Sequence, residues 1–158
     1  FRRLVVQALD NYGDLGRLLR SPLCDLPTVD RRLTGRNAEK PLARALELRA
    51  VLLESVARLK PDGLFGTSDE WRPYNALYFC CVQGLRPYDR NPDIDGLDRD
   101  GRRALEWFRR YVSERSLREW QLAGADQVAA RLWGDLMRSH PRWLTRSGAR
   151  VAPPTRST

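Results

Sequence analysis

Residues 98–137 constrain the fold more than any other stretch, because they predict two helices joined by a very short turn. Apolar side chains recur at helical spacing over residues 102–112 and again from Ser116 to about Met137. Only residues 113–115 separate the two patterns. Two helices joined by three or four residues form the outline of a helix-turn-helix motif. A tight corner in any helical bundle gives the same outline, so the pattern predicts local structure before it predicts a function.

The residues after the turn also predict where the second helix begins. Ser116 and Glu119 have the spacing of a capping box, in which the serine accepts a hydrogen bond from a backbone N–H and the glutamate returns to the cap. This spacing places the start of the helix at Ser116. Its inner stripe is then expected to contain Leu117, Trp120, Gly124, Val128 and Leu132. The candidate site residues lie in the turn and on the outer side of the first helical turns: Ser113, Arg115, Ser116, Arg118, Gln121 and Leu122.

These residue types suit a surface that contacts DNA. The last three of the candidate residues are expected to read base edges in the major groove, and the first three to contact phosphates. Two acidic residues of the same helix, Glu119 and Asp126, would repel phosphates unless they turn away. A helical corner inside an interaction bundle, with no groove contact, fits the pattern equally well.

Part of this stretch resembles a known class of regulators. Residues 113–117, Ser-Glu-Arg-Ser-Leu, followed by Ala123 and by Ala-Ala-Arg-Leu at 129–132, resemble the start of the recognition helix in region 4 of sigma factors and in related bacterial regulators. More loosely, residues 71–84 together with the helix pair resemble a helical domain of large multidomain regulatory proteins from actinomycetes. The resemblance implies a bacterial DNA-binding domain that acts in transcription regulation.

The charge of the chain is positive and unevenly distributed. Its 28 basic and 20 acidic side chains give a formal net charge of +8, and every basic residue except Lys40 and Lys60 is arginine. Arginine pairs with phosphate oxygens, so a basic, arginine-rich chain is typical of nucleic-acid binding. A GC-rich genome produces the same arginine content. Residues 61–100 are acidic as a segment, whereas the segments on both sides are basic, so only part of the surface suits DNA.

The remaining apolar patterns are helical as well. They predict helices at residues 2–20, where Gly13 and Gly16 allow a break, at 42–60 and from 69 to 84, with one helical turn near 28–33. We therefore expect an all-α, single-domain bundle of five or six helices over residues 1–138, with a C-terminal helix-turn-helix-like pair at 102–137. Residues 139–158 are expected to form a basic tail or linker. The residues of the 42–60 helix expected to face the core are Leu42, Ala45, Leu46, Ala50, Leu53, Val56, Ala57 and Leu59.

No residue pattern points to catalysis or to a metal. The three cysteines are odd in number and are expected to be small buried side chains in a reducing cytoplasm, and the single histidine is His140. Residues 91–96 resemble the front of an EF-hand loop, but Arg102 stands where the loop needs a glutamate. Asp98 and Asp100 are instead expected to cap the next helix. Since no phosphate-binding glycine loop is present, we expect neither an enzyme nor a metal or small-molecule cofactor.

Two functions remain open from the sequence. The preferred one is a sequence-specific DNA-binding domain of a bacterial transcription regulator, with the second helix of the pair in the major groove of double-stranded DNA. The alternative is a helical protein–protein adaptor or assembly domain of a larger signalling or defence protein, which binds a partner protein or forms a homodimer. No run of eighteen apolar residues is present, so no membrane partner is expected and the localisation is expected to be cytoplasmic.

Overall fold

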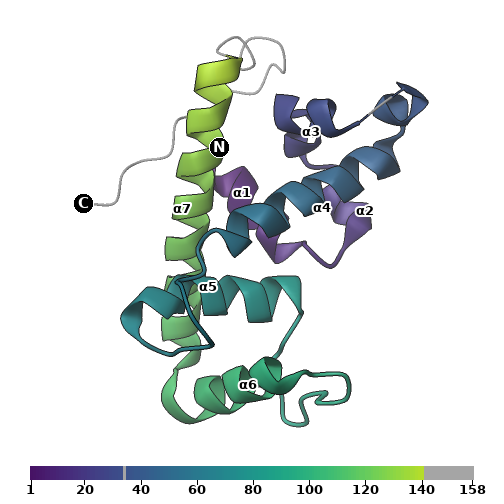
Figure 1. The fold of residues 1–158 in the computed structure, drawn as a ribbon. Helices are drawn as coiled ribbons and strands as arrows, with labels where there is room; N and C mark the ends of the chain where they lie inside the picture. The colour runs from purple at the N-terminus through teal and green to yellow at the C-terminus, as the bar shows by residue number, and fades with distance from the viewer. Residues whose placement is uncertain (34, 141–158) are drawn as a thin grey trace.

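The computed structural model describes residues 1–33 and 35–140, and within them it contains helices and no strand (Figure 1). The predicted all-α bundle is confirmed. The described part of the chain has one α-helix more than the predicted five or six, because the first predicted helix is divided in two; the helical turn predicted near 28–33 forms as a short helix that begins at Pro27. The described α-helices are α1 (Arg2–Asp10), α2 (Leu15–Leu18), α3 (Pro27–Arg32), α4 (Pro41–Ala57), α5 (Arg72–Leu77), α6 (Arg99–Tyr111) and α7 (Glu114–Ser139).

Short helical turns complete the described chain. Three are 3₁₀ helices, η1 (Pro22–Asp25), η2 (Gly35–Glu39) and η3 (Asp69–Trp71), and one is a π-helical turn, η4 (Tyr78–Val82). Helices η3, α5 and η4 follow one another directly and form the single helix predicted from 69 to 84. Its predicted central position is confirmed, since Tyr74, Asn75, Leu77 and Phe79 are all buried. Of the predicted tail, residues 141–158 lie outside the described part of the chain.

The longest helix, α7, connects two clusters of buried side chains. Along its C-terminal half, Val128, Leu132 and Leu136 pack with α1 and α4 in the first cluster. Near its N-terminal end, Leu117 packs with Phe108 of α6 in the second cluster. Figure 1 shows α7 running the height of the molecule, with α6 crossing its lower end. Every described part of the fold is therefore built against this one helix or against its immediate neighbours.

Gly124 lies where α5 crosses α7 most closely. A Cβ atom added there would be 2.7 Å from Leu77 Cδ1 and 3.3 Å from the carbonyl oxygen of Pro73. Such distances are shorter than ordinary van der Waals contact, so glycine at this position sets the separation of the two helices. The predicted inner stripe of α7 is borne out at this and neighbouring positions, because Leu117, Gly124, Val128 and Leu132 are buried.

The first predicted helix, residues 2–20, is broken after Asp10. Residues 11–14 form a turn, and the Asp14 side chain accepts a hydrogen bond from the backbone N–H of Arg17 at 3.1 Å. Aspartate is a strong N-cap residue, so it starts α2 as a separate helix. The turn also brings the Tyr12 ring beneath the guanidinium of Arg49, 5.7 Å from its centroid. The apolar periodicity of residues 2–20 continues through the break, which is why it predicted one helix.

The predicted core side of α4 is only partly correct: Ala45 and Val56 are fully buried as predicted, but the leucines of the prediction are not. Leu42, Leu46 and Leu53 were expected to be buried, but they are 52%, 41% and 36% exposed, and Ala57 is exposed too. The buried residues are Ala45, Leu48, Val51, Leu52, Ser55 and Val56. The apolar residues of α4 cover an arc wider than one packed face, with the exposed leucines next to the buried residues, so periodicity alone did not decide which part of the arc packs. Tertiary ion pairs to α3 and η1 fix the rotation of the helix instead.

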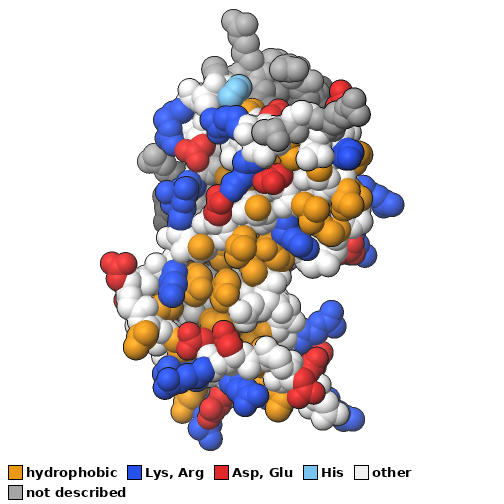
Figure 2. Space-filling view, turned by 45° about the vertical axis from the view of Figure 1, so that its right-hand side comes forward, with side chains coloured by type: hydrophobic (Ala, Val, Ile, Leu, Met, Phe, Trp, Pro, Cys, Tyr) orange, Lys and Arg blue, Asp and Glu red, His pale blue; other side chains and the backbone are white. Residues whose placement is uncertain are grey.

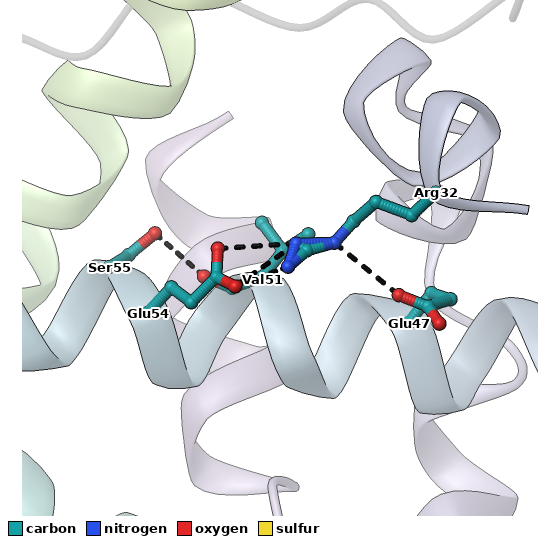
Figure 3. A network of polar contacts seen from close by, with 5 residues as sticks. All are labelled: Arg32, Glu47, Val51, Glu54 and Ser55. Atoms are coloured by element: carbon teal, nitrogen blue, oxygen red, sulfur yellow. Dashed lines mark hydrogen bonds and ion pairs between the residues drawn. The ribbon is translucent and has the colours of Figure 1, made fainter.

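Arg32 of α3 provides one set of these contacts (Figure 3). Its Nε donates a hydrogen bond to Glu47 at 3.3 Å, and the guanidinium also pairs with both carboxylate oxygens of Glu54. Arg44 provides the second set, since its Nε donates to the carbonyl oxygen of Cys24 at 3.0 Å and the guanidinium pairs with Asp30. These contacts hold one flank of α4 against α3 and η1.

Candidate functional site

The corner between α6 and α7 is tighter than the sequence suggested. Only Val112 and Ser113 separate the two helices, and Val112 has extended backbone angles that turn the chain. Ser113 Oγ accepts a hydrogen bond from the backbone N–H of Ser116 at 3.1 Å, so Ser113 is the N-cap. The prediction that the helix begins at Ser116 is wrong, because serines at both positions have capping potential. Ser116 lies within the first turn, with its Oγ 3.0 Å from that of Ser113.

The loop before α6, residues 83–98, holds this corner in place, and we call it the acidic loop. The Tyr88 hydroxyl donates a hydrogen bond to the carbonyl oxygen of Val112 at 2.8 Å. The Arg109 guanidinium donates to the carbonyl oxygens of Pro87 and Asp89 at 3.0 and 2.9 Å. Burial raises the pKa of Tyr88 to about 12, so its hydroxyl remains a donor at neutral pH.

The ends of α6 and α7 also pack through stacked aromatic rings. Trp107 of α6 lies against Trp120 of α7, with ring centroids 5.6 Å apart and ring planes 15° from parallel. The helix pair is therefore held in place both by hydrogen bonds from the loop and by the stacked tryptophan rings. It forms a three-helix unit with α5, which packs along α7.

The six predicted site residues fall into two groups in the structure. Ser113, Arg115 and Ser116 lie together at the N-terminal end of α7, and the Arg115 side chain is 90% exposed. Arg118 and Gln121 instead lie toward α1. Leu122 is half-buried on α7.

Arg118 is held by a carboxylate far away in the sequence. Its two terminal nitrogens donate to the two carboxylate oxygens of Asp10 in α1, at 2.8 and 3.0 Å, and one of them also donates to Gln121 at 3.1 Å. The hydrogen bonds to Asp10 raise the pKa of Arg118 further above its ordinary value. Two of the three side chains predicted to read bases, Arg118 and Gln121, are therefore engaged within the protein. The sequence contained no signal for this pair, because 108 positions separate its members.

The exposed start of α7 is not a positive surface. Arg115 and Arg118 contribute two positive charges there, whereas Glu114, Glu119 and Asp10 contribute three negative ones. Glu119 lies 3.4 Å from Arg115 and offsets its charge directly. A phosphate backbone approaching this end of the helix would meet a locally balanced or negative field.

Asp126, the second acid that counted against groove contact, is turned away from the outer side of α7. It forms an ion pair with Arg2 of α1, and its side chain is 20% exposed. Helix α1 therefore runs beside α7 and engages residues from Arg118 to Asp126. That arrangement occupies the side of α7 that faces α1, whereas the first turn of α7 stays open to a large ligand.

The acidic loop lines a hollow of about 650 Å³ beside α6. Two of its carboxylates act within the protein: Asp98 accepts a hydrogen bond from the Gly101 N–H at 2.7 Å as the N-cap of α6, and Asp93 accepts one from the Asp95 N–H at 3.0 Å. The predicted capping role of Asp98 is confirmed. Within residues 1–33 and 35–140, no three His, Cys, Asp or Glu side chains come close enough to share a metal ion.

The three cysteines are free thiols with suppressed acidity. Cys24 is buried and donates to the carbonyl oxygen of Leu18 at 3.1 Å, while Cys80 and Cys81 are half-buried. Burial raises the pKa of all three, and it raises that of Cys81 to about 12. A thiol must ionise to act as a nucleophile, so the structure offers no reactive cysteine among them.

A second surface, which sequence reasoning assigned to the core, lies on α4. It comprises Leu42, Leu46 and Leu53 together with three alanines beside them, and we name it the α4 leucine face: Leu42, Ala43, Leu46, Ala50, Leu53 and Ala57. One edge is bordered by the Arg32 contacts from α3, and the other by Arg49 over Tyr12. Figure 2 shows hydrophobic side chains gathered at the height of α4, with basic side chains beside them. The signal in the sequence was a helix apolar nearly all round, which needs partners on both sides.

Comparison with models of known protein families, with curated proteins and with solved structures found no match to the chain. Along residues 1–33 and 35–140, no helix combines the length and apolar character required to cross a bilayer.

Proposed function

We propose that the chain is a helical adaptor domain that binds a partner protein through the α4 leucine face. The observation that supports this function is the exposure of Leu42, Leu46 and Leu53 on one side of a helix whose other side forms the core. Scattered exposed leucines need no explanation, but leucines aligned on one helix face are typical of interaction surfaces.

The leucine face is held ready for binding. Helix α4 is fixed on its inner side by fully buried Leu48 and Leu52, and on its flank by Arg32 and Arg44. A surface that does not reorganise loses less conformational entropy when it binds. Rigid presentation of an apolar helix face is what an adaptor domain requires.

Site-specific photo-crosslinking tests the adaptor function. A photoreactive phenylalanine analogue at position 46 is expected to give one discrete adduct in an extract of the source cells. The same analogue at position 64 serves as the control, because Leu64 is 91% exposed but lies outside the face. Excess unlabelled domain should compete the adduct away, whereas the Leu46→Gln, Leu53→Gln double variant should not. Equal labelling from both positions, or no competition, would contradict the proposal.

DNA binding through α7 is the second candidate function. It is favoured by the three-helix unit of α5, α6 and α7, whose last two helices meet at a two-residue corner with Arg115 fully accessible. The pairing of Arg118 with Asp10 and the local acidic charge disfavour it. In this function the first turn of α7 would contact phosphates, and Arg118 would have to leave Asp10 to reach a base.

A salt titration separates this candidate from the adaptor function. DNA binding predicts affinity for a random duplex at about 50 mM salt that falls steeply toward about 200 mM. Arg115→Ala should weaken it, and Asp10→Asn should strengthen it by releasing Arg118. Arg131→Ala is the matched control, since Arg131 is exposed on α7 about four turns after Arg115. Absence of binding at the lower salt concentration would remove the DNA-binding candidate.

A further inference from the structure

The shape of the leucine face suits a second helix. At about 100° per residue, Leu42, Leu46 and Leu53 fall within roughly 40° of arc and form a ridge along α4. Ala50 and Ala57 follow within roughly another 40° and form a shallow groove beside the ridge. A ridge next to a groove of small side chains is the surface against which α-helices pack.

The charges around the face are basic. Lys40, Arg49 and Arg58 lie along or at the ends of the stripe, and none has a carboxylate partner among the described residues. The two acids of α4, Glu47 and Glu54, are both engaged by Arg32. Arg32 neutralises only one of these two acids, and Glu39 lies next to Lys40, so four positive and three negative side chains surround the face and its rim is net positive by one charge.

We infer that the α4 leucine face binds an amphipathic helix of another protein, whose apolar stripe is flanked by acidic residues. This inference rests on the proposed adaptor function and names the chemistry of its partner. Leucines of the partner pack along the ridge from Leu42 to Leu53, and its carboxylates pair with Arg49 on one side and with Lys40 or Arg58 near the ends. Recognition of this kind combines apolar anchors at i, i+3, i+4 and i+7 with charges that set orientation.

Other occupants fit the face less well. A second copy of the chain would bring two basic rims together, in a protein whose net charge is already +8. A β-strand would find no backbone groups to pair with, because those of α4 are used within the helix. A lipid surface requires side chains that protrude, whereas the leucines are buried by half or more against their neighbours, except Leu42 at 52% exposure.

A pair of synthetic peptides tests the inference. Both are as long as α4, 17 residues, and carry leucines on one helical face; one has glutamates on its flanks and the other has lysines. Fluorescence anisotropy is expected to show binding of the glutamate peptide, at least about tenfold tighter than that of the lysine peptide. Arg49→Glu with Arg58→Glu should reverse this preference.

Two variants of the protein locate the binding. Leu46→Gln with Leu53→Gln should weaken binding of the glutamate peptide at least about tenfold, whereas Leu64→Gln should leave it unchanged. Circular dichroism of each variant verifies that the helices are retained. Binding that survives the double α4 substitution overturns the inference, because the peptide then binds elsewhere.

The remaining outcomes distinguish the inference from the adaptor function. Equal binding of both peptides, lost in the double variant, overturns the acidic partner but leaves the docking face. If the protein forms a concentration-dependent dimer and the double variant does not, the face binds a second copy. If the protein binds vesicles of phosphatidylserine and phosphatidylcholine and the double variant does not, the face binds lipid. Either result overturns the inference. If neither peptide, vesicle nor second copy binds, and no crosslink forms at position 46, both the inference and the adaptor function fail.

Discussion

Tyr88 joins the acidic loop to the α6–α7 corner through one partly buried hydrogen bond to Val112. Its hydroxyl can donate that bond only while it is protonated. Together with Arg109, it fixes the position from which α7 begins, and the loop that carries it packs against the second cluster. Single side chains of this kind determine the geometry of the corner more directly than the apolar pattern of either helix.

Substitution of this tyrosine should change both stability and its pH dependence. Tyr88→Phe is expected to lower the free energy of unfolding by about 1 kcal/mol, because one net hydrogen bond is lost. The raised pKa of Tyr88, about 12 against an ordinary 10, favours the folded state fully below pH 10 and is lost as the pH rises through about 12. The variant should therefore show a shallower loss of stability in that interval, measured by urea unfolding at a series of pH values.

Tyr111→Phe is the control for this measurement, since Tyr111 is 73% exposed. It should leave both the stability and the alkaline slope near those of the parent protein. Tyr74, whose pKa burial also raises to about 12, retains part of the slope in either variant. An unchanged slope in Tyr88→Phe would show that its hydroxyl is not shielded as described.

At the scale of elements, the separation of α5 and α7 depends on Gly124. Gly124→Ala is expected to destabilise the protein by about 1–3 kcal/mol, because the new methyl group overlaps Leu77 and the Pro73 carbonyl oxygen. This cost exceeds the gain of about 1 kcal/mol that alanine brings to a helix. Chemical unfolding measures the difference.

Gly134→Ala in the same helix is the matched control. There the nearest atoms to an added Cβ belong to the flexible end of Arg138, at 3.4 Å. This variant should be as stable as the parent or more stable, by up to about 1 kcal/mol. If both variants were destabilised equally, helix crossing would not explain the glycine at 124.

The two sides of α4 should respond differently to truncation. Leu52→Ala, on the fully buried side, is expected to cost about 2–5 kcal/mol through the cavity it leaves. Leu46→Ala, on the exposed side, is expected to cost less than about 1 kcal/mol. Thermal or urea unfolding of the two variants measures these losses of stability and so shows which side of α4 is buried. Similar losses in the two variants would contradict the described orientation of α4.

The same helix shows what the sequence reveals and what it does not. Periodicity predicted α4, α6 and α7 because each has a continuous apolar stripe, and Asp98 was recognised as a cap from its place before one of them. Periodicity did not determine the buried side of α4, since its apolar residues cover an arc wider than one packed face and long-range ion pairs decide which part of it packs. Nor did it reveal the contact between Arg118 and Asp10, which exists only after α1 has packed on α7.

At the scale of the molecule, α7 makes the two clusters of buried side chains one structure. Trp133 lies against Phe1 in the first cluster, with ring centroids 5.2 Å apart, and Trp107 lies in the second. Because both clusters pack on the same helix, neither can lose its structure without exposing the other. The bundle is therefore expected to unfold as a single cooperative unit.

Tryptophan fluorescence checks this cooperativity. With Trp143 replaced by Phe in both variants, Trp107→Phe with Trp120→Phe leaves Trp71 and Trp133 to report on the first cluster, and Trp71→Phe with Trp133→Phe leaves Trp107 and Trp120 to report on the second. After correction for the stability change of each variant, their urea transitions should coincide with each other and with the loss of helical circular dichroism. Two separated transitions would mean that α7 does not couple the clusters.

The position of α7 at the end of the described chain also affects how the protein is made. Residues 1–113 leave the ribosome before the helix on which both clusters pack has emerged. At roughly 5–20 residues per second, the nascent chain spends several seconds with both apolar surfaces uncovered. We therefore expect chaperones near the ribosome exit to bind the nascent domain, and the final fold to form only when residues 114–139 emerge.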